Sequence, residues 1–366
     1  YEESRIRFRG YADSLHNLWI NPQLETHPLQ EFPDLSIDWI WAKPPRPEYL
    51  IIISIGEHGI EGYVGSAMLH LFLEEFVAQL DPQNSGLLLI HAINPWGMKN
   101  YQRYNAQHVD LNRNFLPNDE YNPSFNPEYK MLSSLFCPKR PINSYPAETL
   151  FFTANLFTSL IRHGATVIRN SALMGQFMDS HGINYGGQNR QEETQVMLDL
   201  FQKAFEEYPH ITHLDMHSGY GPRNQMSIVL SPLTQESSAN LARKLNYPRV
   251  VKSNNEEFYP IQGDMIDFEY HLQSSTFPQN HLFAAAFEFG TFGDSLLAAI
   301  RSLRAEVMHN QLSNWGAKNE HIAARVNQEF RQLFYPTEMD WQTKALADCR
   351  LAFNGVLSAF GLRKNS

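Results

Sequence analysis

Short apolar runs alternate with longer amphipathic segments along this chain. The runs at 50–55 and 87–93 are rich in Ile and Leu, a pattern typical of strands that are buried on both faces. Strands are also predicted at 35–41, where apolar and polar residues alternate, and at 211–216, 227–230 and 282–289. Helical periodicity predicts helices over 4–20, 62–80, 149–168, 188–208, 295–315, 320–334 and 341–360.

This alternation of strands and helices predicts an α/β fold. We expect a mixed, mainly parallel twisted sheet with helices on both faces. The 366 residues contain no repeat, which favours a single catalytic domain over 1–366. Within it, residues 295–366 are predicted to be a helical C-terminal extension packed on the rest. The Pro- and Asn-rich stretch 116–145 is predicted to be a long loop at the rim of a crevice.

Composition narrows the class of partners. The net charge of −10 and the pI of about 5.8 argue against nucleic acid, which requires a basic surface. No apolar run is long enough to span a membrane, and no signal peptide is visible. Two cysteines cannot form a disulfide framework in a chain of this size, so a cytoplasmic location is expected. The chain begins with Tyr1 and not with Met, which leaves a removed leader open, and the oligomeric state is open as well.

Polar residues of the types used in catalysis and ligand binding follow four of the predicted strands. The four groups lie at 57–61, 94–97, 217–221 and 288–290. In open α/β sheets, ligands bind in the crevice outside the carboxyl ends of the strands. We therefore expect these groups to share one crevice.

The first group contains His58 and Glu61, three residues apart where a strand turns into a helix. Imidazole nitrogen and carboxylate oxygen are zinc ligands, and catalytic zinc sites use three protein ligands. The pair alone is weak evidence, because about one such pair arises by chance in a chain of this composition. The alternative is a Glu favoured by a helix N-terminus beside a structural His.

A second group offers a third ligand. His213, Asp215 and His217 alternate along a predicted strand and therefore share one of its faces. A lone His in such a place is more often a buried structural residue whose hydrogen bonds are made within the protein. Asp215, close to the strand end, nevertheless favours a functional role for His217. His213 lies deeper in the strand and is interpreted as structural.

The remaining groups supply a carboxylate and a cationic clamp. Glu288 lies in the apolar run 283–289, where an unpaired carboxylate is costly to bury. It is either a salt-bridged strand residue or a general base. In the second case, burial would raise the pKa of its carboxyl toward neutrality. Arg103, Asn112 and Arg113 suit the binding of a carboxylate, and the simpler alternative for an Asn-Arg pair is a turn with solvated charges.

Taken in this order, the four groups resemble the zinc carboxypeptidase superfamily of the carboxypeptidase A type. The ligand pattern there is His-x-x-Glu followed much later by His. The whole layout, with its helical tail, is similar to a bacterial carboxypeptidase-like branch whose substrate is not settled. The segment from Arg103 to Arg113 looks closer to succinylglutamate desuccinylase and aspartoacylase, which hydrolyse N-acyl amino acids.

The resemblance implies one Zn²⁺ per chain, held by His58, Glu61 and His217. It also implies that Asp110 orients His58. Glu288 would then be the general base for attack on an amide carbon.

The same resemblance implies roles in substrate binding. Asn112, Arg113 and Tyr259 would bind a substrate carboxylate, and Ile266 would lie near the side-chain pocket. Arg103 would stabilise the developing oxyanion.

The expected function is therefore a zinc-dependent metallohydrolase that cleaves an amide bond next to a free carboxylate, with a small peptide as substrate. The alternative substrate is an acyl amino acid, which would make the chain an N-acyl amino acid amidase of the desuccinylase–aspartoacylase type. A pseudoenzyme that only binds a ligand is disfavoured, because candidate ligands, base and clamp occur together.

Overall fold

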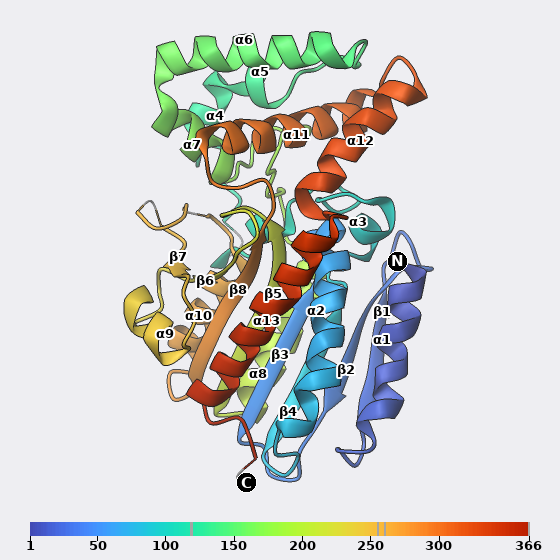
Figure 1. Ribbon diagram of the computed structural model, residues 1–366, viewed down its shortest axis with the longest axis vertical. Helices are drawn as coiled ribbons and strands as arrows, with labels where there is room; N and C mark the ends of the chain where they lie inside the picture. Colours follow the sequence, from blue (N-terminus) through green and yellow to red (C-terminus); the bar gives the residue numbers. More distant parts are fainter. Residues whose placement is uncertain (118–119, 255, 260, 365–366) are drawn as a thin grey trace.

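The computed structural model describes residues 1–117, 120–254, 256–259 and 261–364. Its centre is an eight-stranded sheet with the order β1-β2-β4-β3-β5-β8-β6-β7 (Figure 1). The strands are β1 (Gln23–Pro28), β2 (Ser36–Ala42), β3 (Tyr49–Ile55), β4 (Ser85–His91), β5 (His210–Gly219), β6 (Met226–Leu230), β7 (Val250–Lys252) and β8 (His281–Gly290).

Parallel pairing dominates the middle of this sheet. The neighbours β4, β3, β5 and β8 run in one direction, and β6 pairs in parallel with β7. The pairs β1–β2, β2–β4 and β6–β8 are antiparallel. The prediction of a mixed, mainly parallel sheet is therefore confirmed.

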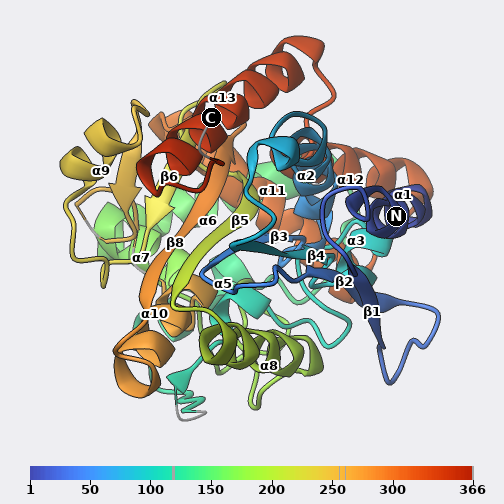
Figure 2. The same cartoon turned by 90° about the horizontal axis from the view of Figure 1, so that it is seen from below.

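Helices cover both faces of the sheet (Figure 2). One face carries α1 (Glu2–Leu15), α2 (Gly62–Glu75), α9 (Ser238–Lys244) and α13 (Met339–Ala359). The other face carries α8 (Glu192–Glu207) and α10 (Met265–Thr276). Since both faces are buried, β3 contributes Ile51 and Ile53 to one core cluster and Leu50 and Ile52 to the other, which explains its continuous apolar sequence.

A further layer of helices lies beyond the carboxyl ends of the central strands, at the top of Figure 1. It consists of α3 (Pro95–Asn100), α4 (Pro127–Met131), α5 (Ser133–Phe136), α6 (Tyr145–His163), α7 (Ala165–Leu173), α11 (Leu296–Trp315) and α12 (Glu320–Phe334). Most of these helices share a core cluster of their own, which includes Phe136, Phe152 and Val307. Of the C-terminal helices, α12 contacts β5 and α13 contacts α2.

Two predictions in this layer are wrong. The helix predicted over 149–168 is two helices, because Gly164 between α6 and α7 has a φ of 81°, which a continuing helix does not allow. The stretch 116–145, predicted as a loop, contains α4 and α5, and its residues 118–119 lie outside the described residues. The start of α4 follows from ordinary capping chemistry, since Asn126 accepts a hydrogen bond from Tyr129 N and Pro127 occupies the first turn.

Other boundaries differ by a few residues. The helix expected over 62–80 ends at Glu75, and a 3₁₀ turn follows at Val77–Gln79. The helix expected over 4–20 ends at Leu15. Within the described residues, no helix combines the length and the hydropathy needed to cross a bilayer.

Candidate metal centre

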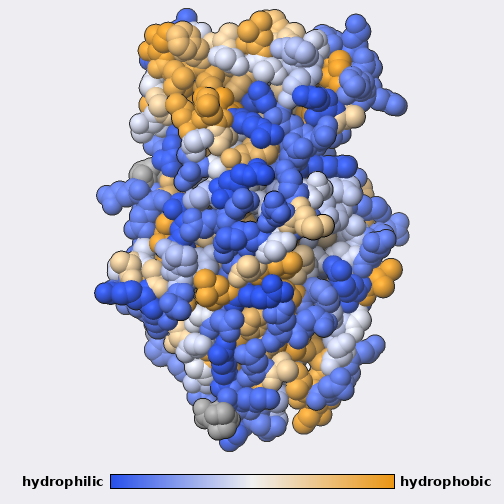
Figure 3. Space-filling model, viewed as in Figure 1, coloured by the Kyte–Doolittle hydropathy of each residue, from blue (hydrophilic) through white to orange (hydrophobic). Residues whose placement is uncertain are grey.

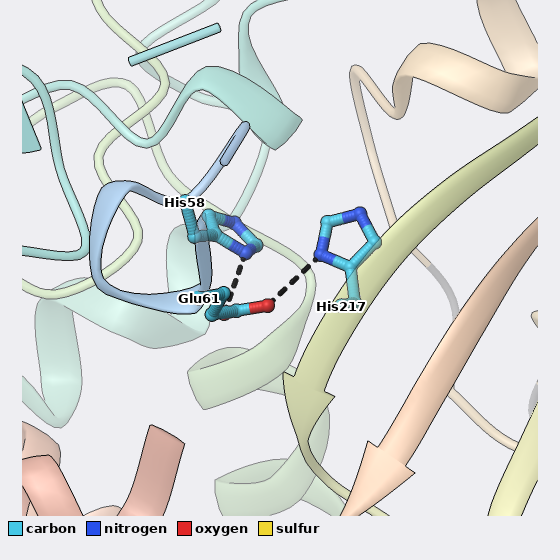
Figure 4. Close-up of side chains that lie close together, drawn as sticks. All are labelled: His58, Glu61 and His217. Atoms are coloured by element: carbon cyan, nitrogen blue, oxygen red, sulfur yellow. Dashed lines mark hydrogen bonds and ion pairs between the residues drawn. The ribbon is translucent and has the colours of Figure 1, made fainter. Parts of the chain in front are cut away.

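The three predicted ligands meet at the carboxyl edge of the sheet (Figure 4). His58 and Glu61 lie at the turn between β3 and α2, and His217 lies near the end of β5. The Glu61 carboxylate lies between the two imidazoles, with Oε1 2.9 Å from His58 Nδ1 and Oε2 3.1 Å from His217 Nδ1. One atom from each residue lies within 4.8 Å of the others, so the three side chains could hold one metal ion.

Carboxylates hold the outer nitrogen of each imidazole. His58 Nε2 lies 3.0 Å from Asp110 Oδ1, and His217 Nε2 hydrogen-bonds with Asp215. Apart from its contact with Glu61 Oε1, His58 Nδ1 is buried without a hydrogen bond. A metal-ligating His commonly donates its other N–H to a carboxylate, which fixes the tautomer. A buried nitrogen that faces a carboxylate without a hydrogen bond, together with the N/O donor set, therefore fits a metal ion such as zinc.

The charges of the site keep these carboxylates ionised. Burial would raise the pKa of Glu61, but His58 and His217 lower it well below its usual range. Burial would also raise the pKa of Asp110, but Arg103 and His58 lower it well below its usual range. An ionised carboxylate is the form that binds a metal.

A second set of three buried groups also could hold a metal ion, namely Glu57, Asp215 and His217. It lies behind the crevice, whose lining includes His58, Glu61 and His217 but neither Glu57 nor Asp215. Asp215 is also occupied by a hydrogen bond of 2.5 Å from Ser54 Oγ. The set that faces the crevice is therefore the candidate metal centre.

Glu288 lies beside His217, because β5 and β8 pair in parallel with these two residues in register. Its side chain lines the crevice, and its Oε1 accepts a hydrogen bond of 3.0 Å from the backbone N–H of Tyr220. Burial and then the negative charge of Glu61 raise the pKa of Glu288 to about 7. The described residues place no cationic side chain in an ion pair with this carboxylate, so the salt-bridged alternative is wrong.

Arg103 lies between two carboxylates at the edge of the site. Its Nη1 donates to Glu61 Oε1 over 3.2 Å, and its Nε donates to Asp110 Oδ2 over 3.3 Å. Asn94 supports this arrangement, because its Nδ2 donates to the carbonyl of Arg103 and its Oδ1 accepts from Gly97 N at the start of α3. The group at 94–97 was predicted to share the crevice, but none of its residues lines it. That prediction is wrong, and Asn94 acts on the site only by supporting Arg103.

Arg113 carries a buried positive charge that lines the same crevice. The residue is 1% exposed, and its guanidinium donates to the carbonyls of Asn112 and Leu173 over 2.8 and 2.7 Å. Its Nε has no partner, and in the described part of the chain it forms no ion pair. The alternative of a turn with solvated charges is therefore wrong. Asp110 and Asp264 interact with this charge electrostatically without forming an ion pair, and its Nε still lacks an acceptor, so the site is suited to an anionic ligand.

Asn112 also lines the crevice and joins the clamp to α10. Its Oδ1 accepts a hydrogen bond of 3.0 Å from Met265 N. The neighbouring Gly263 has a φ of 75°, and a Cβ there would lie 2.3 Å from the carbonyl oxygen of Arg113. Glycine at this position therefore allows the two segments to pack closely.

The structure also places Tyr259 and Ile266 in the lining of the crevice. The Tyr259 ring stacks on Phe258 at a centroid distance of 4.4 Å and meets the Tyr220 ring edge-on at 5.8 Å. Burial and the nearby Glu288 raise the pKa of Tyr259 well above its usual range, so its hydroxyl stays a neutral hydrogen-bond donor.

His213 is buried away from the crevice, as expected for a structural residue. Its Nε2 lies 2.7 Å from Ser54 Oγ, and its Nδ1 lies 2.6 Å from Glu269 Oε2. Asp215 accepts from the same Ser54 hydroxyl, so the polar face of β5 forms one continuous hydrogen-bonded chain up to His217.

Sequence reasoning missed two residues of the site, the half-buried Tyr220 and the buried Glu306. The Tyr220 hydroxyl donates to Glu306 Oε1 over 2.8 Å, and the Tyr220 backbone holds Glu288. Glu306 belongs to α11, so the C-terminal helices contribute directly to the surroundings of the site. A charged residue among buried positions of a helix is a weak sequence signal, and only the fold shows where it points.

Comparison with known proteins identifies the family of the chain. Residues 1–348 match the family described as "Protein of unknown function (DUF2817)", and the chain belongs to that family. No curated protein sequence matches the chain.

Several solved structures are similar to the chain at low sequence identity. Carboxypeptidase A from Helicoverpa armigera is 13% identical with a TM-score of 0.47, and the match covers 91% of this chain and 73% of that one. Bovine thrombin-activatable fibrinolysis inhibitor, solved with tick carboxypeptidase inhibitor, is 14% identical with a TM-score of 0.48, covering 88% and 96%. A succinylglutamate desuccinylase from Silicibacter sp. TM1040 is 10% identical with a TM-score of 0.38, covering 80% and 65%.

Proposed function

We propose that this protein is a zinc-dependent hydrolase that cleaves an amide bond next to a free carboxylate, and that its substrates are short peptides. One observation carries the proposal. A single crevice is lined by the candidate ligands, by Glu288 and by the guanidinium of Arg113, which forms no ion pair and leaves its Nε without an acceptor among the described residues. A metal ion would account for the candidate ligands, and an anionic group of the substrate would account for Arg113.

The chain's own residues divide the work of binding and proton transfer. Arg113 and Asn112 bind and orient the substrate carboxylate, which fixes the amide bond near the ligands. Tyr259 donates a hydrogen bond to the bound substrate. Glu288 takes a proton from the attacking water and then passes it to the leaving amine, a task that suits a carboxyl whose pKa lies near 7.

His58, Glu61 and His217 would hold the zinc ion, with Asp110 orienting one of the imidazoles. When bound, zinc supplies Lewis-acid chemistry that polarises a carbonyl and lowers the pKa of water. Arg103 keeps Glu61 and Asp110 in place, and we assign its remaining N–H groups to the developing oxyanion.

A substrate panel tests this proposal with zinc-loaded protein. We expect release of the C-terminal residue from peptides with a free carboxylate and little release from the same peptides as C-terminal amides. N-acyl amino acids form the second arm of the panel. Faster hydrolysis of N-acyl amino acids would make them, and not peptides, the substrate class, with the roles of the residues unchanged. Absence of hydrolysis of both classes would contradict the proposal.

Two variants connect the activity to the site. Glu288→Gln should retain zinc and lose turnover by about 10²- to 10⁴-fold, the range for loss of a general base. Arg113→Lys keeps the charge but removes the planar fork, so it should weaken binding of carboxylate substrates and narrow the difference between free and amidated peptides. Arg162, an exposed arginine at the end of α6, gives the matched control Arg162→Lys, which should behave as wild type.

A further inference from the structure

Helix α6 presents an apolar seam to solvent at one end of the molecule. It is the outermost helix at the top of Figure 1, and apolar side chains gather at the top of the same face in Figure 3, over α6 and α7. The buried face of α6 contributes Phe152 and Leu156 to the core it shares with α11. The opposite face of α6 is exposed to solvent.

Five exposed apolar residues form this seam, and they are Ala147, Leu150, Ala154, Phe157 and Ile161. Leu150, Phe157 and Ile161 are 70%, 65% and 72% exposed, which is unusual for three large apolar residues on one helix. The intervals between the five positions are three, four, three and four residues, the spacing of a coiled-coil seam. Such spacing is suited to packing against another helix.

The residues of α6 beside the seam carry no charge, and Arg140, whose guanidinium lies 5.0 Å from the Phe151 ring at the edge of the seam, is paired with buried Glu148. Exposed Phe151, Thr153 and Thr158 flank the seam, and the segment 149–161 contains no Asp, Glu, Lys or Arg. Charged residues at such flanks set the choice of a different partner helix and repel like partners. A neutral seam on a chain with net charge −10 is therefore a place where two copies of this chain can approach each other.

The order of residue sizes along the seam is self-complementary for antiparallel pairing about Ala154. In that register the small Ala147 of one copy faces Ile161 of the other, and Leu150 lies next to Phe157. The two Ala154 residues meet at the two-fold axis, where small side chains allow close approach. The antiparallel arrangement also places the positive N-terminal end of each helix dipole beside the negative C-terminal end of the other.

We propose that the seam of α6 is a homodimer interface, in which α6 of two copies packs as an antiparallel pair about a two-fold axis through Ala154. Each residue then contacts its counterpart reciprocally, as a two-fold interface requires. A single helix pair is small compared with the roughly 800 Å² per partner of a standard interface. The dimer should therefore dissociate as the protein is diluted.

Sedimentation velocity of the full chain over a range of concentrations tests the proposal. We expect wild type to pass from monomer to dimer with increasing concentration, and Phe157→Glu to remain monomeric throughout. The control is Ile6→Glu, which places a glutamate on α1 at an apolar residue that is 70% exposed, and it should dimerise as wild type does. Wild type that is monomeric at every concentration, whether or not it binds phosphatidylcholine–phosphatidylserine vesicles, would overturn the proposal.

Cysteine cross-linking tests the register independently of the affinity. The native Cys137 and Cys349 are buried, so a new exposed thiol should react selectively. Ala154→Cys should form a disulfide-linked dimer on oxidation, because the two positions meet at the axis. Ala147→Cys should not, since the antiparallel register separates its two copies by about 21 Å along the helices, beyond the reach of a disulfide. Cross-linking of both variants, or of Ala147→Cys alone, would overturn the antiparallel pairing.

Discussion

Asp110 offers a test of the metal centre that needs no substrate. Its carboxylate accepts from His58 Nε2 at 3.0 Å and from Arg103 Nε at 3.3 Å, and the residue is fully buried. Loss of a carboxylate that orients a ligating His typically weakens metal binding about 10- to 100-fold, or about 1.4 to 2.7 kcal/mol. Asp110→Asn retains an acceptor oxygen and should lie near the lower figure, whereas Asp110→Ala removes it and should lie near the upper one.

Competition with a chromophoric zinc chelator at pH 7.5 measures this change directly. Asp38→Asn is the matched control, because Asp38 is also fully buried and accepts from Arg5 and Arg9 at 3.2 and 2.8 Å. Both substitutions remove a buried carboxylate that pairs with arginine, so both should lower the free energy of unfolding. Only Asp110→Asn should weaken zinc binding. Equal zinc affinity in folded Asp110→Ala and Asp38→Asn protein would refute the orienting role.

Two further predictions concern protonation. Because the pKa of Glu288 lies at about 7 and only its carboxylate accepts a proton, kcat/KM should fall about tenfold per pH unit on the acid side of that value, and a flat profile between pH 5 and 7 would contradict the assignment of the base. Burial raises the pKa of Glu193 from 4.5 to about 7, so the unfolded chain ionises first and wild type loses stability as the pH rises through this range. Glu193→Gln should therefore be more stable than wild type at pH 8, by at most about 3 kcal/mol, and should gain nothing at pH 4 in urea denaturation. A gain of equal size at both pH values would show that ionisation of Glu193 is not the cause.

The central strands could be predicted because burial on both faces leaves a clear pattern in the sequence. The sequences of β3, β4 and β8 are mostly apolar, and they lack the regularly spaced polar residues of an amphipathic helix. Strand β1 was missed for the opposite reason. Its sequence is mostly polar and its side chains are largely exposed, so its strand form depends on pairing with β2 and not on local pattern.

The candidate ligands could be found because each lies in a local motif at a strand end, and the parallel topology brings strand ends together. Residues that reach the site from distant helices could not be found in this way. Glu306 lies on α11 and meets Tyr220 only through the packing of the C-terminal helices on the sheet. The apolar sequence of α6 predicted a helix correctly but not its break at Gly164, nor that half of its apolar positions face solvent.

Metal content of the purified protein is the most direct test of the account. His217→Ala removes a predicted ligand, and His210→Ala is its control, because His210 lies on the same strand but stacks on Tyr49 at the opposite end. Elemental analysis should find about one zinc per chain in wild type and His210→Ala, and far less in His217→Ala. Absence of metal from folded wild type after incubation with zinc, or full retention in His217→Ala, would contradict the metal centre and the hydrolase built on it.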